Sequence, residues 1–427
     1  MTAPAIALIV TMLLFLLLGT PIYLAILFAS VVSAFVKGTN PTVIIQRMYA
    51  ANDSFSLLAI PFFYMAGDLM VQGGIASRLV NLAKSLLGRL KGALTVITFV
   101  ACAFFGAISG SSYATTASIG KIMYPEMVQD GYEKGFAAVL QAVGGTLGVL
   151  IPPSILCVLY GVATGASVGD MLLYIAPVGI ATTLVYILTA QRLISSGKLN
   201  FYRAEQEHRY AASGKEVLNN LKEAFWAILS PVIILGGIYT GVCTPTECAA
   251  IACMYALIIG LFVYRELNIR KIFKSIMQSV LGTACVIIIF DTATAFSYMM
   301  TINRIASAVA TWVSNTMSSV FVFLLLVNLV YAVAGMFVEG SVTITVITPL
   351  LFPIAVKYGV NPIHFGVVSI LNCIIGTLTP PFGGALFIAS GITEVPVTTL
   401  VRRVWPFVLA GFSLCLVITY LPFLWLY

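Results

Sequence analysis

The sequence predicts an all-α polytopic membrane protein built from two inverted repeats. The chain is 60% hydrophobic and only 9% charged, with a mean hydropathy of +1.05, whereas a soluble domain is about 25% charged. Apolar stretches of about 20 residues, long enough to cross a bilayer, recur along the whole chain. Paired prolines interrupt one such stretch in each half, at GVLIPPS (148–154) and GTLTPPFGG (376–384). We therefore expect a protein embedded in a lipid bilayer, with no enzymatic centre and no nucleic-acid partner.

An internal repeat supports the division into two halves. Residues 124–153 align without gaps on residues 352–381, and the identical positions include Pro125/Pro353, Gly131/Gly359, Gly148/Gly376 and both proline pairs. Glycine and proline set local backbone geometry, so matches at these positions indicate a structural repeat. The halves span 1–195 and 223–427. The polar segment 196–222 joins them, and we expect it to be a cytoplasmic linker with a helix along the membrane surface.

Each half is expected to contain the same elements in the same order. They are scaffold helices with a Thr-Pro interruption, a surface arm, a re-entrant helical hairpin, a broken helix and a final span. In the first half the scaffold, arm, hairpin and broken helix cover 4–73, 74–92, 93–128 and 134–165. In the second half they cover 225–300, 302–316, 318–357 and 361–391. The hairpins are expected to be re-entrant because serine and glycine cluster in the middle of an apolar stretch, as in FFGAISGSSYATT.

The distribution of basic residues predicts the orientation. About five crossings per half is an odd number, so the second half is inverted relative to the first. If the N-terminus is outside, the only lysines and arginines outside are Lys37, Arg47, Arg304 and Lys357. The positive-inside rule favours that orientation, so both termini are predicted to be periplasmic.

The proline breaks predict a binding site at mid-membrane. Unpaired backbone is tolerated there only where it lines a cavity inside the protein, and equivalent breaks in inverted halves indicate a transporter. Freed carbonyls and hydroxyls suit Na⁺, so we expect sodium at Ser109, Ser111, Gly148, Ile151, Gly340, Gly376 and Thr379. Half-helix N-termini suit an anion, so we expect the substrate at Ser112, Thr115, Ser154, Ser341, Gly383 and Gly384.

Two structural interpretations remain open for these motifs. Proline and glycine also kink ordinary membrane-spanning helices, although two breaks in register make this less favoured than a site. The serine and threonine cluster at 109–116 also suits close helix packing, for which small residues are preferred.

Long motifs resemble one transporter family. The stretches GAISGSSYATTASIG, GTLGVLIPPSILCVLYGVATGASVGD and TPLLFPIAVKYGVNPIHFGVVSILNCIIGTLTPPFGGALFIASG are similar to the large membrane (permease) subunit of the tripartite ATP-independent periplasmic (TRAP) transporters. The likeness covers nearly the whole chain. Glu339 stands where the family often has Asp, and Gly384–Ala385 stands where a larger, more polar pair is usual.

The resemblance implies an elevator-type secondary transporter of bacterial inner membranes. It implies Na⁺-driven uptake of an organic acid, such as sialic acid or a C4-dicarboxylate. It also implies two partners, a small four-helix membrane subunit and a soluble periplasmic binding protein that delivers the substrate.

Three rival functions are also compatible with a membrane-embedded chain of this kind. The rivals are a stand-alone Na⁺/dicarboxylate symporter, an ion channel, and an intramembrane serine protease. The protease would need a histidine near Ser109.

Carboxylates inside membranes are functional candidates by default, which singles out Asp68 and Asp291. Glu339 is a candidate for cation or proton coupling, and Arg304 for contact with an anion, although a solvated position suits Arg304 better.

Overall fold

The computed structural model is helical throughout the part of the chain that it describes, namely residues 2–90, 92–196, 212–316, 319–381 and 383–421. Within these residues, eight helices are long and apolar enough to cross a membrane, or nine if the bent pair α8–α9 counts as one span. The predicted all-α polytopic membrane fold is confirmed. The inverted orientation of the halves stays a prediction.

The first part of the N-terminal half is a series of short helices. Helices α1 and α2 flank the Thr20–Pro21 interruption, and α5 follows a left-handed glycine, Gly74 (φ 75°). The bounds are α1 Ala3–Leu17, α2 Ile22–Lys37, α3 Thr42–Ala51, η1 Phe55–Leu58, α4 Ala59–Gln72 and α5 Ile75–Leu87.

The rest of this half contains a helix–turn–helix pair and a bent pair. Helices α6 (Ala93–Ser109) and α7 (Ser112–Gln129) meet at a two-residue tip. Helices α8 (Lys134–Leu150) and α9 (Ile155–Thr164) are separated by the first proline pair and bend by 46°. Helix α10 (Val168–Ser195) then closes the half.

The second half runs through the same kinds of element. A capping box closes the start of α12, where the Glu247 carboxylate accepts the Thr244 N–H at 2.8 Å. Glu247 is therefore a helix-capping residue. The bounds are α11 Gly214–Tyr239, α12 Pro245–Ile258, a π-helical turn η3 Ile259–Val263, α13 Ile269–Ile302, α14 Ile305–Thr316, α15 Val320–Phe337, α16 Gly340–Lys357, α17 Pro362–Gly376, α18 Gly384–Thr393 and α19 Val397–Tyr420.

Two boundaries differ from expectation. The described end of the linker does not form a separate surface helix, because Ser213 and Glu216 build a capping box that starts α11 at Gly214; residues 197–211 lie outside the described part. The third scaffold helix of the second half, expected over 276–300, starts earlier, at Ile269, where Asn268 caps it. In the first half the third scaffold helix is expected over 53–73 and is found as η1–α4, with Asn52–Ser54 separating it from α3.

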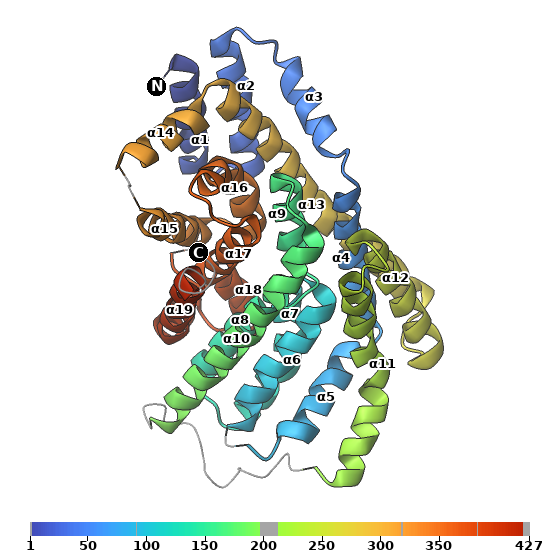
Figure 1. Ribbon diagram of the computed structural model, residues 1–427. Coiled ribbons are helices and arrows are strands. Elements are labelled where there is room, and N and C mark those ends of the chain that lie inside the picture. The colour runs from blue at the N-terminus through green and yellow to red at the C-terminus, as the bar shows by residue number, and fades with distance from the viewer. Residues whose placement is uncertain (1, 91, 197–211, 317–318, 382, 422–427) are drawn as a thin grey trace.

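The helices pack into one large core and two smaller ones. Side chains of α6–α10 and α15–α19 form most of the large core, and α4, α5 and α11–α14 add further side chains to it. One small core joins α1, α2, α3 and α14 to α13, and the other joins α4 and α5 to α11 and α12. Helix α13 contacts both α2 and α4, so it runs between the two smaller groups (Figure 1). Both small cores use scaffold and arm elements, whereas the large core is built mainly from hairpin, broken-helix and final helices.

Candidate functional site

The first hairpin tip is held by its own hydroxyls. Gly110 takes a left-handed conformation (φ 61°) that lets the chain reverse between α6 and α7, and Ser111 caps α7. The Thr115 hydroxyl donates to the Ser111 carbonyl at 2.8 Å and lies 3.0 Å from the Ser109 hydroxyl. These three oxygens therefore gather on the buried side of the tip.

This tip lies directly against the first proline break. A Cβ built on Gly110 would stand 2.7 Å from the Pro153 carbonyl oxygen. A Cβ on Gly148 would stand 2.2 Å from the Thr115 hydroxyl and 2.6 Å from the Ser111 carbonyl oxygen. Because real Cβ atoms do not approach so closely, glycine at both positions is what allows the contact.

The break itself leaves polar groups without helical partners. Pro152 and Pro153 carry no N–H, so the carbonyls of Gly148 and Val149 have no donor four residues ahead. Ile151 ends α8 in an extended conformation, and Ser154 occupies the capping position of α9. The Ser154 hydroxyl is fully buried and has no hydrogen-bond partner among the described residues.

The second tip carries an acidic side chain. Glu339 precedes α16, and its carboxylate accepts a hydrogen bond from the Ser341 hydroxyl at 2.8 Å. Close glycine packing holds this hairpin to the broken helix, since a Cβ on Gly376 would stand 2.7 Å from the Gly335 Cα. The Gly383 N–H also donates to the Met336 carbonyl at 3.4 Å.

The second break is more fully bonded than the first. The Gly376 carbonyl accepts the Thr379 N–H at 2.8 Å, and the Thr379 hydroxyl donates to the Ile375 carbonyl at 2.9 Å. We had expected Gly376 to present a free carbonyl, but a tight turn supplies the donor that Pro380 lacks. The Thr379 hydroxyl oxygen keeps its lone pairs and can still accept a cation.

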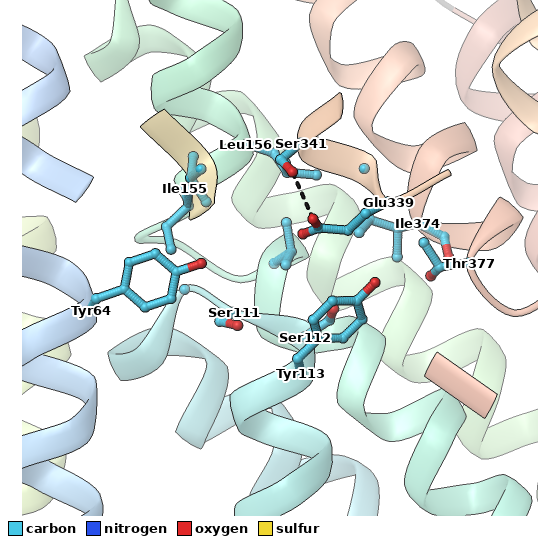
Figure 2. Close-up of a pocket in the computed structure, with 14 residues that line it drawn as sticks. Tyr64, Ser111, Ser112, Tyr113, Ile155, Leu156, Glu339, Ser341, Ile374 and Thr377 are labelled. Carbon is cyan, nitrogen blue, oxygen red and sulfur yellow. Dashed lines mark hydrogen bonds between the residues drawn. The ribbon is translucent and has the colours of Figure 1, made fainter. Parts of the chain in front are cut away.

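A small cavity lies where the tips and the broken helices meet (Figure 2). Its volume is about 30 Å³, which is room for one or two water-sized particles and not for an organic acid. Both halves contribute to its lining, and the described residues that line it are Tyr64, Gly110, Ser111, Ser112, Tyr113, Val149, Ile155, Leu156, Val286, Glu339, Gly340, Ser341, Ile374 and Thr377.

The electrostatics of this cavity combine one carboxylate with several helix N-termini. Among the described lining residues Glu339 is the only charged side chain, and none is lysine, arginine or histidine. The first turns of α7, α9 and α16 all reach the cavity. Helix N-termini carry partial positive charge and unpaired N–H groups, which attract anions. The cavity therefore offers hydrogen-bond donors to an anion and one acidic side chain to a cation.

The predicted site residues divide between the cavity and the layer behind it. Ser111, Ser112, Gly340 and Ser341 line the cavity. Outside the lining are Ser109, Thr115, Gly148, Ile151, Ser154, Gly376, Thr379, Gly383 and Gly384. Most of these lie in the tip-to-break contacts described above, and Gly384 instead faces the Tyr113 hydroxyl.

Sequence reasoning missed two tyrosines. Tyr64 comes from α4 and Tyr113 from the first turn of α7, and Figure 2 shows both rings beside the cavity. Tyr113 directly follows the serine cluster, which was a usable signal. Tyr64 had none, because only the packing of α4 brings it to the site.

The other charged candidates lie elsewhere. Asp68 accepts a hydrogen bond from the Ser279 hydroxyl at 3.2 Å, which ties α4 to α13. Asp291 lies on α13 and Arg304 in the α13–α14 turn, and neither lines the cavity. Glu339 is thus the acidic candidate that the structure brings to the cavity.

Comparison with known proteins identifies the family. A family model described as "Tripartite ATP-independent periplasmic transporter, DctM component" matches residues 9–424. The chain belongs to this family. It is 36% identical to the C4-dicarboxylate TRAP transporter large permease protein DctM of Pseudomonas aeruginosa, covering 88% of this chain and 86% of that one. It is 34% identical to the sialic acid TRAP transporter large permease protein SiaM of Vibrio cholerae, covering 95% and 93%.

Two further comparisons bear on length and fold. The permease is 38% identical to the isethionate TRAP transporter permease protein DctMQ of Oleidesulfovibrio alaskensis, over 96% of this chain but only 64% of that longer protein. The crystal structure of the YdaH transporter of Alcanivorax borkumensis matches with a TM-score of 0.66 at 14% identity, covering 90% of this chain and 88% of that one. That likeness shows a shared fold. DctM-family proteins are transporter permeases and not enzymes, so the expectation of a transporter subunit is confirmed and the serine protease is discarded.

Proposed function

We propose that this permease carries an organic acid across the bacterial inner membrane by Na⁺-coupled uptake. The acid is a carboxylate of the sialic acid or C4-dicarboxylate kind, or the sulfonate that one relative's name suggests. A periplasmic binding protein delivers it, and a small four-helix membrane subunit completes the transporter. Both termini are periplasmic.

One observation carries the proposal, which is the charge balance of the cavity. An anion that enters meets the Glu339 carboxylate, and no basic side chain among the described lining residues offsets it. Two like charges close together repel strongly in a medium of low polarity. A cation bound beside Glu339 removes that repulsion, so binding of the cation and of the acid becomes coupled.

The available ligands favour sodium as that cation. At the first tip the oxygen ligands on offer are the hydroxyls of Ser109, Ser111 and Thr115, and Gly148, whose carbonyl has no helical donor because residue 152 is proline, packs against Thr115. At the second tip they are the Glu339 carboxylate, the Ser341 hydroxyl and the Thr379 hydroxyl. Among the described residues no three His, Cys, Asp or Glu side chains converge. Neutral hydroxyl and carbonyl oxygens suit a hard monovalent cation.

An elevator movement is the transport step that fits this architecture. The cavity offers only about 30 Å³, too little for the acid, so the acid would bind in a conformation where Tyr64 of α4 and Val286 of α13 separate from the tips. The tips and breaks pack against one another and would move together, while α4 and α13, which also contribute side chains to the large core, would stay with the scaffold.

Reconstitution tests the proposal. The permease, its small subunit and the binding protein are assembled in liposomes, and uptake of labelled succinate, N-acetylneuraminic acid and isethionate is followed with and without an inward Na⁺ gradient. We expect gradient-dependent uptake of one of these acids that requires the binding protein. Robust uptake by this chain alone would instead support the stand-alone symporter, and flux without saturation would support a channel.

A further inference from the structure

The turn before the second arm helix is fixed by a lysine from the first half. The Lys37 ammonium group, at the end of α2, donates to the Ile302 carbonyl at 2.7 Å and to the Asn303 side-chain oxygen at 3.1 Å. Asn303 in turn donates to the Ser33 hydroxyl at 2.9 Å. Ile302 is the last residue of α13, and the arm helix α14 starts three residues later.

The turn before the first arm helix is fixed in the same way by the second half. The Lys271 ammonium group, in the first turn of α13, donates to the Gln72 carbonyl at 3.3 Å and to the Glu266 carbonyl at 2.8 Å. Gln72 is the last residue of α4, and the arm helix α5 starts three residues later. Arg78 adds a bond to the Gly74 carbonyl at 2.8 Å and an ion pair with Glu266 at 2.7 Å.

The two contacts are equivalent in the order of the elements. Lys37 lies between the second and third scaffold helices of the first half and bonds to the last carbonyl of α13, the third scaffold helix of the second half. Lys271 lies at the corresponding place in the second half and bonds to the last carbonyl of α4, the third scaffold helix of the first half. Final helix carbonyls lack intrahelical donors and carry partial negative charge, so an ammonium group is a favourable partner. The turns also share a left-handed residue just before the arm, Gly74 (φ 75°) or Arg304 (φ 57°).

We propose that Lys37 and Lys271 are positioning residues that lock the scaffold end of each arm helix during transport. The proposal rests on the elevator movement proposed above. In such a movement each arm joins a fixed part to a moving part. With the scaffold end locked, the change in backbone angle is confined to the far end of the arm, and the direction of the movement is fixed. Each half of the chain thereby fixes the scaffold end of the arm helix of the other half.

The locks are tested with Lys37→Met and Lys271→Met, which keep the length of the side chain and remove the donor. In reconstituted transporter supplied with whichever of succinate, N-acetylneuraminic acid or isethionate the wild type carries, the maximal uptake rate should fall by about three- to ten-fold. Equilibrium binding of the labelled acid to the purified transporter should not change, because neither lysine lines the cavity. Arginine at either position should restore the rate, since it also donates. Lys215→Met, an exposed lysine of α11, is the matched control.

A second measurement tests, without any transport, whether the two lysines hold the turns before the arm helices. Hydrogen–deuterium exchange in the second turns of α5 and α14, where the amides are bonded within the helix, should be about ten-fold faster in the corresponding methionine variant. Unchanged exchange together with an unchanged maximal rate overturns the proposal. A loss of rate that follows a loss of folded protein, or that arginine does not restore, also overturns it. If the wild type shows no Na⁺-driven uptake, the proposed function fails while the exchange data still decide whether the lysines hold the turns.

Discussion

The hydroxyl of Tyr113 lies so close to Gly384 that a Cβ on this glycine would stand 2.7 Å from the tyrosine oxygen. Tyr113 belongs to the first hairpin and Gly384 starts α18 of the second half. The pair therefore joins the two halves beside the cavity.

Substitution at this pair should be strongly non-additive. Gly384→Ala places a methyl group against the Tyr113 oxygen and should lower uptake about ten-fold, because overpacking costs about 1–3 kcal/mol. Tyr113→Phe removes that oxygen and should restore uptake in the double variant, as measured by initial rates in liposomes. Gly391→Ala is the control, because no atom lies within 4 Å of its Cβ position on the same helix. A double variant as slow as Gly384→Ala alone would contradict this account.

Gly148→Ala should be more damaging than Gly384→Ala. Its methyl group would meet the Ser111 backbone oxygen at 2.6 Å as well as the Thr115 hydroxyl. A backbone atom cannot turn away as a side chain can, so the first tip must separate from the break. We expect uptake to fall below about 1% of wild type while the protein remains in the membrane. Gly169→Ala, whose nearest neighbour is 3.8 Å away, is the control.

Sodium dependence should report the two tips separately. Ser111→Ala and Thr379→Val each remove one hydroxyl and should raise the half-saturating Na⁺ concentration about ten-fold, because each removes one oxygen ligand. The measurement is the uptake rate as a function of external Na⁺. Ser413→Ala removes a hydroxyl from α19 that bonds only to the Leu409 carbonyl, and should have no effect. If both tip variants keep the wild-type sodium curve, the assigned ligands are wrong.

Glu339→Gln should weaken the coupling of sodium to the acid. Glutamine keeps the shape and can still accept from Ser341, but it removes the charge that a cation would balance. We expect a half-saturating Na⁺ concentration at least about ten-fold higher, with less loss of acid binding at saturating sodium. Binding of the labelled acid to purified transporter, measured at low and high Na⁺, separates the two effects. An unchanged sodium requirement would exclude Glu339 from coupling.

Cysteine labelling in intact cells decides the orientation. Lys215 at the start of α11 should be cytoplasmic, and Tyr427, which lies outside the described residues, should be periplasmic. In a cysteine-free background, a cysteine at 427 should react with an impermeant thiol reagent and one at 215 should not. Labelling at 215 and not at 427 would refute the inverted arrangement of two halves with five crossings each.

The parts of the site visible in the sequence are those that depend on local backbone chemistry. The proline pairs, the glycine at the first tip and the serines beside it each restrict the chain within a few residues, so they mark the tip and the break. The contact between the tip and the break is also visible in the sequence, because glycines such as Gly148 leave room for the two segments to approach closely. The bonding of the Gly376 carbonyl was not predictable, because it depends on a turn that the residue types allow but do not require.

Tertiary packing decided the remaining features. Tyr64 reaches the cavity only because α4 packs against α6, α12 and α13. The lysine contacts at Ile302 and Gln72 join residues far apart in the sequence, and no local pattern marks them.

The difference between α13 and its counterpart has a consequence for the timing of transport. Helix α13 is one helix of 34 residues, whereas the first half divides the same stretch at Asn52–Ser54. A continuous helix resists bending, and an interrupted one yields at the joint. In the elevator movement proposed above, the two halves would therefore give the moving part supports of unequal stiffness. Influx and efflux of the same acid, measured at equal driving force, should then have different rate constants, so the transporter would work as a rectifier.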